Sequence, residues 1–171
     1  MSWMQTYTGR KFFPAEPKAE DVSIKDIAHS LSLHCRFNGH TKWFYSIAEH
    51  SVRVSDILPQ ELKLWGLLHD AAEAYTGDII RPVKKLLVGA EAMEDVILKV
   101  IVEKYGLAWP MPREVAIADD TVLVTEKRDL MGESPDEWGL DLQPLAKIIE
   151  PWASENAELV FLEAFENLYN P

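Results

Sequence analysis

Residues 68–78 read LHDAAEAYTGD and combine a His-Asp pair with two further acids. On a helix His69 and Glu73 are spaced i and i+4, and Asp70 and Glu73 are spaced i and i+3, so the three side chains lean toward one point. Asp78 follows a glycine turn that ends such a helix. One metal ion and one water fit this arrangement, which is typical of a metal-centred hydrolase.

The size and composition of the chain predict a single globular domain over residues 1–171. The chain has 171 residues, and 47% of them are hydrophobic, enough for one core but short for two. Its single cysteine, Cys35, has no partner for an internal disulfide. The first residues lack the pattern of a signal peptide, and charges interrupt every apolar segment before the roughly 20 residues that cross a bilayer. We therefore expect a cytoplasmic protein with no membrane partner.

The charge is strongly acidic and unevenly distributed. The net charge is -11, which argues against a nucleic-acid partner, because such proteins present a basic surface. Residues 119–171 hold thirteen acids and three bases, whereas residues 1–118 hold fifteen acids and fourteen bases. An anionic substrate therefore needs local help from a metal ion or a small basic cluster.

Apolar periodicity predicts helices separated by polar, turn-rich segments. Residues 1–20 contain two prolines and a glycine without helical periodicity and are expected to form an extended or looped arm. Residues 36–45 and 132–144 are expected to be loops. The expected helices are 24–35, 46–58, 60–75, 84–105, 114–131 and 152–168. No alternating run indicates a sheet, so we predict an all-α bundle, with 132–171 as an acidic helical extension packed on it.

Two histidines and an aspartate on neighbouring helices are candidate metal ligands. His50 lies on the apolar stripe of its helix, and packing of that helix against the next brings it beside His69 and Asp70. Two imidazoles and one carboxylate suit zinc, manganese, iron or cobalt and leave positions for water and a substrate oxygen. A single histidine on an apolar stripe is more often a hydrogen-bonded core residue. The conjunction of the two histidines and Glu73 on buried stripes of successive helices, followed by a Gly-Asp pair and a further aspartate in an apolar helix, favours a metal site.

A fourth ligand is expected from the segment IADDTVLVTEKRDL, residues 117–130. Its acidic pair, Asp119 and Asp120, lies among apolar residues, and burying an unpaired carboxylate costs several kcal/mol that a cation offsets. The alternative is that both acids lie at a surface. The residues alone do not decide between Asp119 and Asp120.

With these motifs the chain resembles the HD-domain phosphohydrolases. IAEHSVRVS (47–55) resembles the first-histidine helix of that family, and LLHDAAEAYTGDIIRPVKK (67–85) resembles the His-Asp motif of its 5′-deoxynucleotidase branch. IADDTVLVTEKRDL resembles the last-aspartate helix. Residues 26–51 are also similar to small bacterial and phage HD proteins. These include the dATP triphosphohydrolases of viruses that replace adenine in their DNA. The resemblance covers about residues 6–131.

The resemblance implies an HD-domain helical bundle and assigns its metal ligands. These ligands are His50, His69, Asp70 and Asp119, with Asp120 as the second choice. Asp119 is preferred because the family places its aspartate directly after a small residue, as here. The implied metal is zinc, manganese, cobalt or iron, with magnesium as a candidate second ion. A dimer or hexamer is implied as well.

The same resemblance implies roles in catalysis and substrate binding. Glu73 matches the acid that positions and activates the attacking water, and Asp78 matches a residue near the sugar and the scissile phosphate. Arg36 and Phe37 match an Arg-Trp pair that contacts phosphate and sugar, with Phe in place of Trp. Lys84 matches a phosphate-binding lysine. Lys85 and Arg81 either extend this basic clamp or are solvated surface bases.

These residues predict a metal-dependent phosphohydrolase of nucleotides. A bound ion lowers the pKa of its water from about 15.7 to about 7, which supplies a nucleophile at neutral pH. The aromatic and polar residues of segment 36–45 provide surfaces for a base. A 5′-deoxynucleotidase and a dATP-type triphosphohydrolase are both compatible with this pattern. Alternatives are a hydrolase of signalling nucleotides, such as guanosine polyphosphates or cyclic nucleotides, and a non-catalytic nucleotide sensor.

Overall fold

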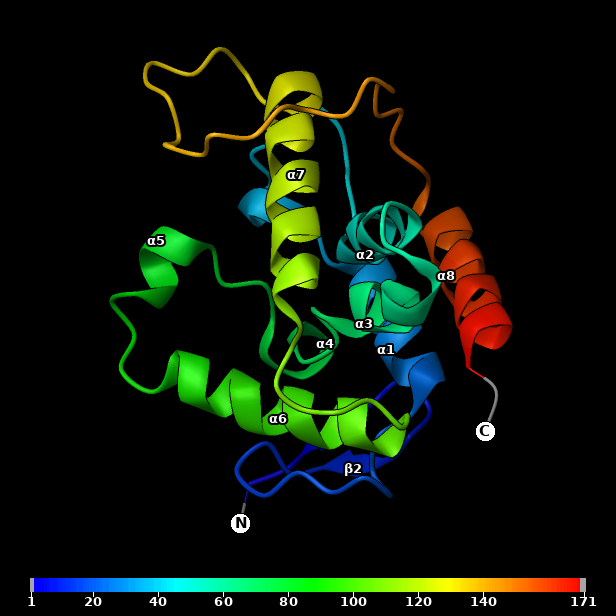
Figure 1. The fold of residues 1–171 in the computed structure, drawn as a ribbon. Coiled ribbons are helices and arrows are strands. Elements are labelled where there is room, and N and C mark those ends of the chain that lie inside the picture. Colours follow the sequence, from blue (N-terminus) through cyan, green and yellow to red (C-terminus); the bar gives the residue numbers. More distant parts are fainter. Residues whose placement is uncertain (1, 170–171) are drawn as a thin grey trace.

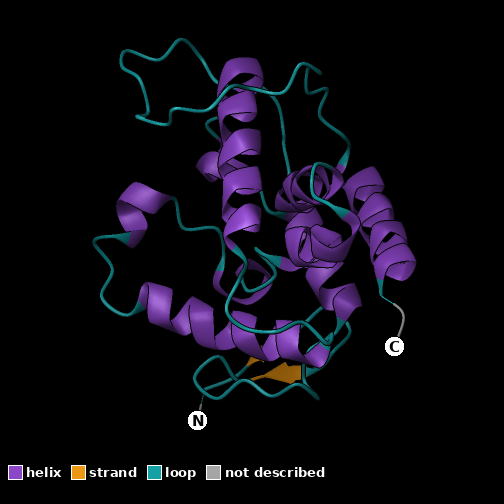
Figure 2. Cartoon of the chain, viewed as in Figure 1, coloured by secondary structure: helices purple, strands orange, loops and turns teal. Residues whose placement is uncertain are grey.

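The computed structural model describes residues 2–169 and is predominantly helical (Figures 1 and 2). The predicted all-α class is confirmed at this level, and the first residue and last two residues of the predicted domain lie outside the described part. The α-helices are α1 (Ile24–Leu33), α2 (Ile47–Asp56), α3 (Lys63–Leu68), α4 (Glu73–Thr76), α5 (Arg81–Lys84), α6 (Ala90–Lys104), α7 (Arg113–Leu130) and α8 (Ser154–Leu168). Two short 3₁₀ helices, η1 (Arg36–Gly39) and η2 (Gln60–Leu62), precede α2 and α3.

The N-terminal arm contains a small sheet that the sequence analysis did not expect. Strands β1 (Met4–Gln5) and β2 (Lys11–Phe12) pair antiparallel, with Met4 opposite Phe12. Strands of two residues are too short for an alternating pattern to be visible in the sequence. The Phe12 ring is fully buried and stacks on Tyr75 with ring centroids 3.8 Å apart, so the arm is part of the core.

The helix expected over residues 60–75 is broken in the structure. Between α3 and α4 the hydrogen bonds switch from i−4 to i−3 carbonyls: Ala71 N–H donates to Leu68 O and Glu73 N–H to Asp70 O, both at 3.0 Å. This tighter turn needs no proline or glycine, so no residue type in the sequence indicates it. It changes the directions in which the side chains of residues 69–73 leave the backbone.

The helix expected over residues 84–105 begins later, at Ala90, and only Lys84 of its first six residues is helical, as the last residue of α5. α5 is a single turn, and Gly89 adopts φ +86° before α6 begins at Ala90. Glycine reaches this left-handed conformation without the steric cost of a Cβ atom, so it interrupts the helix. The side chains of Leu86 and Val88 between the two helices are exposed.

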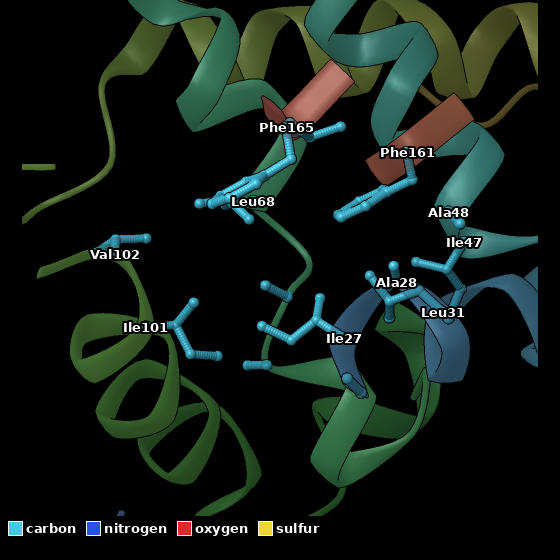
Figure 3. Close-up of a cluster of buried hydrophobic side chains, with 14 of the residues drawn as sticks. Ile27, Ala28, Leu31, Ile47, Ala48, Leu68, Ile101, Val102, Phe161 and Phe165 are labelled. Carbon is cyan, nitrogen blue, oxygen red and sulfur yellow. The ribbon is translucent and has the colours of Figure 1, made fainter. Parts of the chain in front are cut away.

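One hydrophobic core joins helices that are distant in the sequence. α2 packs against α1, α3, α7 and α8, and α8 also packs against α1 and α3. Figure 3 shows Ile27 and Leu31 of α1 near Ile47 of α2 and Phe161 of α8, and all four side chains are fully buried. Burying a side chain of this size contributes about 1.5–3 kcal/mol. The C-terminal helix is therefore held by the same core as the first helices.

A long connection joins α7 to α8. Residues 131–153 cross the upper end of α7 without helix or strand before α8 begins (Figures 1 and 2). Among the helices of residues 2–169, none combines the length and the apolar composition needed to cross a membrane.

Candidate metal centre

Three helical segments bring candidate metal ligands to one buried point. His50 comes from the middle of α2, His69 directly follows α3, and Asp119 lies in the first half of α7. One ligand atom from each of these residues lies within 4.8 Å of the other two, and both histidines are buried. The residues present could therefore hold a metal ion, as the sequence analysis expected.

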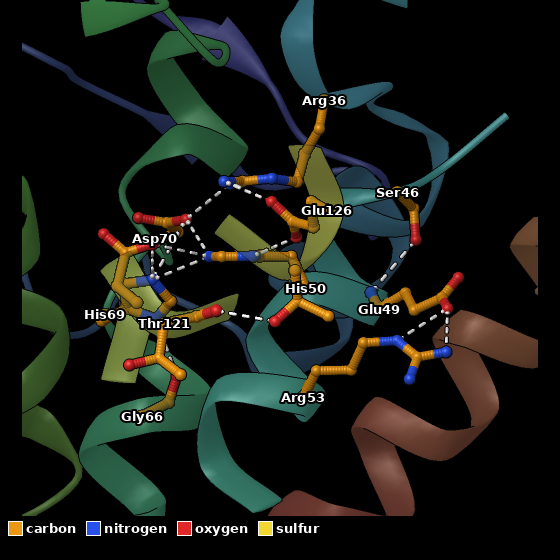
Figure 4. A network of polar contacts seen from close by, with 12 residues as sticks. Arg36, Ser46, Glu49, His50, Arg53, Gly66, His69, Asp70, Thr121 and Glu126 are labelled. Carbon is orange, nitrogen blue, oxygen red and sulfur yellow. Dashed lines mark hydrogen bonds and ion pairs between the residues drawn. The ribbon is translucent and has the colours of Figure 1, made fainter. Parts of the chain in front are cut away.

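Asp70 joins this group at comparable distances (Figure 4). His50 Nε2 lies 3.3 Å from His69 Nε2 and 3.1 Å from Asp119 Oδ1. Asp70 Oδ2 lies 3.3 Å from His69 Nε2 and 3.6 Å from His50 Nε2. Ligand bonds of about 2.0–2.2 Å in tetrahedral or octahedral geometry separate neighbouring ligand atoms by about 3.0–3.4 Å. The contacts of His50 Nε2 with His69 and Asp119 fall in or near this range, whereas His69 Nε2 and Asp119 Oδ1 lie 4.0 Å apart. His50, His69 and Asp119 could therefore hold a metal ion, with Asp70 beside the two histidines.

The hydrogen bonds of the two rings also fit a cation. His50 Nδ1 donates to Glu126 Oε1 at 2.7 Å, and His69 Nδ1 donates to Gly66 O at 2.7 Å. In a neutral imidazole whose Nδ1 carries the proton, Nε2 presents a lone pair. Two such nitrogens lie 3.3 Å apart, and either a proton on one of them or a metal ion between them removes the repulsion of their lone pairs. This donor set therefore matches a divalent transition metal.

The charges around the point favour a cation there. Burial opposes ionisation of Asp70, but His69, His50 and Arg36 hold its pKa well below the ordinary value. The pKa of Asp119 is likewise low in spite of burial, because His50 and His69 stabilise the carboxylate. Burial and Arg36 act to lower the pKa of His50, yet Glu126 and Asp119 raise it to about 9. A proton and a metal ion would compete for the same nitrogen.

Arg36 and Glu126 contact the candidate ligands: Arg36 pairs with Asp70, and Glu126 pairs with His50 (Figure 4). Glu126 is fully buried on α7, and its Oε2 lies 3.3 Å from Arg36 Nη2. Arg36 Nη1 lies 3.4 Å from Asp70 Oδ2. From the sequence Arg36 is predicted as a substrate contact, and Glu126 is not among the predicted site residues. The signal was present, since Glu126 follows Asp119 by seven residues and therefore lies on the same face of the helix.

Glu73 lies beside the ligand group with one free oxygen. It is buried, Oε1 lies 4.0 Å from Lys84 Nζ, and Oε2 has no hydrogen-bond partner among the described residues. Burial, together with Asp70 and Asp78, raises its pKa well above the ordinary value. A buried polar atom without a partner is unusual and indicates a place for water or a ligand. The role of Glu73 as the acid that activates a water stays a prediction.

The remaining sequence-based candidates lie at the edge of this group. Asp78 is half-buried after the turn at Gly77, and burial followed by the charge of Asp70 raises its pKa against the opposing effect of Arg36. Lys84 Nζ donates to Glu94 Oε2 at 2.6 Å. Both residues therefore lie near the ligands without being among them.

Four further residues are placed outside the ligand group. The Phe37 ring packs beside the Arg36 guanidinium, whose Cζ atom lies 5.2 Å from the centroid of the ring. Lys85 is exposed and lines, with Arg81, Lys84, Glu91, Glu94 and Asp95, a cavity of about 370 Å³. Arg81 Nη2 donates to Asp119 Oδ2 and Nη1 to Asp120 Oδ1, both at 2.8 Å. Of the acidic pair, Asp119 faces the histidines, whereas Asp120 contacts Arg81.

Comparison with known proteins shows relatives over nearly the whole chain. No protein-family model matches the chain. It is 41% identical over 172 aligned residues, covering 98% of this chain and 96% of the relative, to a protein of Escherichia coli strain K12 described as "Uncharacterized protein YfdR". It is also 31% identical over 150 residues to "Uncharacterized protein RCAP_rcc00048" of Rhodobacter capsulatus. That alignment covers 80% of this chain and 76% of the relative. The chain therefore belongs to the family of the Escherichia coli protein YfdR.

Proposed function

We propose that this chain is an HD-domain phosphohydrolase that hydrolyses a phosphate ester of a nucleoside or deoxynucleoside 5′-mono- or triphosphate. The observation that carries the proposal is the convergence of His50 Nε2, His69 Nε2 and an Asp119 oxygen at one buried point, with Asp70 Oδ2 3.3 Å from His69 Nε2. The buried Oε2 of Glu73, which has no hydrogen-bond partner among the described residues, supports it. A purely structural cluster has no need for facing Nε2 atoms or for an unpaired buried carboxylate oxygen.

In this proposal His50, His69, Asp70 and Asp119 hold one divalent transition metal, with zinc, manganese, cobalt and iron as candidates. When bound, such an ion supplies an acidified water and withdraws charge from a phosphoryl oxygen. The protein holds the ligands in place through hydrogen bonds from both Nδ1 atoms, at 2.7 Å each. Their Nε2 atoms are thereby directed at the same point before any ligand binds.

Glu73 and the neighbouring bases supply the remaining functions. Glu73 orients the attacking water through its free Oε2 and accepts its proton, and a raised pKa brings a carboxylate closer to the range of an efficient general base. Lys84, 4.0 Å from Glu73, binds the phosphoryl oxygens and stabilises the charge that develops on them. Lys85 on the adjoining cavity extends this clamp toward further phosphates, whereas Arg81 is engaged by Asp119 and Asp120.

The test is a substrate panel with the purified full chain. Deoxynucleoside mono-, di- and triphosphates, guanosine polyphosphates and cyclic nucleotides are incubated with manganese, cobalt or zinc. The released phosphate, pyrophosphate or triphosphate is then identified. We expect turnover of a 5′-nucleotide, and the released group separates a nucleotidase from a triphosphohydrolase. Sedimentation of the same sample tests the proposed dimer or hexamer.

Two variants make the panel decisive. Asp70→Ala is expected to abolish turnover, whereas Asp56→Ala, an exposed acid at the end of α2, is expected to retain it. The proposal fails if the metal-loaded protein turns over no nucleotide, or if Asp70→Ala keeps full activity.

A further inference from the structure

Glu126 uses both of its carboxylate oxygens inside the protein. One oxygen accepts the Nδ1–H of His50 at 2.7 Å, and the other lies 3.3 Å from Arg36 Nη2. Its side chain is fully buried, on the α7 face that also carries Asp119. Glu126 therefore contacts a candidate ligand from behind, on the side opposite Nε2.

Arg36 is committed to carboxylates in the same way. Its Nη2 lies 3.3 Å from Glu126 and its Nη1 3.4 Å from Asp70 Oδ2, and the Arg36 side chain is only 11% exposed. The guanidinium thus connects a candidate ligand, Asp70, with the residue that supports another, His50. A planar fork can hold two carboxylates at fixed positions, which a single ammonium group cannot do.

The two residues need each other in the buried interior. A carboxylate without a partner at this depth would cost several kcal/mol, and Arg36 supplies the compensating charge. Glu126 in turn selects the His50 tautomer whose Nε2 lone pair faces the ligand point. Neither residue needs to contact a substrate to serve this purpose.

We infer that Glu126 and Arg36 are positioning residues of the metal centre: together they orient His50 and Asp70 and thereby set the affinity for the metal. This inference rests on the metal centre of the proposed function. Arg36 thus acts through Asp70 and Glu126, where the sequence predicted a substrate contact, and Glu126 acts through His50.

The experiment measures metal affinity directly, without substrate. Cobalt(II) is titrated into the full-length apoprotein, and binding is followed by its visible absorption, which also reports the ligand geometry. Glu126→Gln keeps the shape of the side chain but removes its charge, and Arg36→Lys keeps the charge but removes the fork. Each variant is expected to bind cobalt about 10–100-fold more weakly than the wild type and to change its absorption spectrum.

The matched control is Glu49→Gln. Glu49 is also fully buried, directly precedes His50 and pairs with an arginine, Arg53, but it faces the C-terminal segment. Cobalt affinity of this variant is expected to equal that of the wild type. Circular dichroism and thermal unfolding verify that each variant is folded at the temperature of the titration.

A double variant tests whether the two residues act as a unit. If Glu126 and Arg36 act together, Arg36→Lys combined with Glu126→Gln weakens binding by less than the product of the two single effects. Independent effects would overturn the inference, as would unchanged cobalt affinity in both single variants. It would equally fail if Arg36→Lys raised only the KM for a nucleotide. If the wild type bound no cobalt, the proposed metal centre itself would fail.

Discussion

Two glutamate–arginine pairs, each with a fully buried glutamate, differ in the residues that they contact outside the pair. The metal-facing pair, Glu126 and Arg36, contacts His50 and Asp70 at the candidate metal centre. The other group, here called the C-terminal clamp, consists of Glu49, Arg53 and Trp152 (Figure 4 shows its glutamate and arginine). Both pairs are chemically alike, so the pairing alone does not distinguish structure from function.

The C-terminal clamp is complete within itself. Glu49 Oε1 accepts two hydrogen bonds from Arg53, at 2.6 and 2.9 Å, and Oε2 accepts the Trp152 N–H at 2.8 Å. The Arg53 guanidinium lies 5.1 Å from the centroid of the Trp152 ring. The contacts that the clamp makes outside α2, to the Trp152 N–H, the Trp152 ring and Glu150 O, all hold the segment that leads to α8. The metal-facing pair instead leads to the two Nε2 atoms of the candidate metal centre, 3.3 Å apart.

The largest expected effect comes from removing a ligand beyond the metal-facing pair. Asp119→Asn weakens metal binding and is expected to lower nucleotide turnover by about 10³-fold, because several kcal/mol of transition-state stabilisation depend on the metal. Asp120→Asn removes only a contact with Arg81 and is expected to change turnover far less. Metal content and turnover of both variants are compared. Equal losses in the two would show that Asp119 is not the ligand of this acidic pair.

A smaller effect is expected when the C-terminal clamp is broken. Glu49→Ala leaves Arg53 and the Trp152 N–H without their acceptor and is expected to lower the free energy of unfolding by about 3 kcal/mol. Cobalt affinity below the unfolding temperature should not change. Urea denaturation measures the first quantity and absorption the second. A large loss of cobalt affinity would contradict the distinction between the two pairs.

The smallest effect concerns a second contact of the C-terminal segment and depends on pH. Asp129 pairs with Arg128 and accepts the Ile149 N–H at 2.9 Å, and these bonds lower its pKa from 3.8 against the opposing effect of burial. A carboxyl with a lowered folded pKa stabilises the fold above pH 3.8, and this contribution is lost as the pH falls through the folded pKa.

Asp129→Asn is therefore expected to cost about 1 kcal/mol at pH 7 and progressively less below pH 3.8. Denaturation of the wild type and the variant at a series of pH values checks this. A difference that stayed constant with pH would exclude the carboxylate charge as its cause.

Local pattern was enough to predict most helices and the ligand types. The expected ends of the helices now seen as α1, α2, α7 and α8 lie within two residues of those observed. Apolar periodicity and helix-capping residues act over a few positions, so the sequence carries them directly. The observed breaks after Leu68 and before Gly89 were missed. The first arises from a change of hydrogen bonding, and the second from a backbone conformation that glycine permits but does not require.

By itself the sequence determined the helical class and which side chains could ligate a metal, because periodicity and side-chain chemistry are local properties. Only the tertiary structure decided that Asp119, rather than Asp120, faces the histidines, and that Glu126 supports His50 across 76 positions of the chain. Such contacts depend on how α2 and α7 pack, and packing is set by the whole core. The arrangement of the centre is therefore a property of the folded molecule.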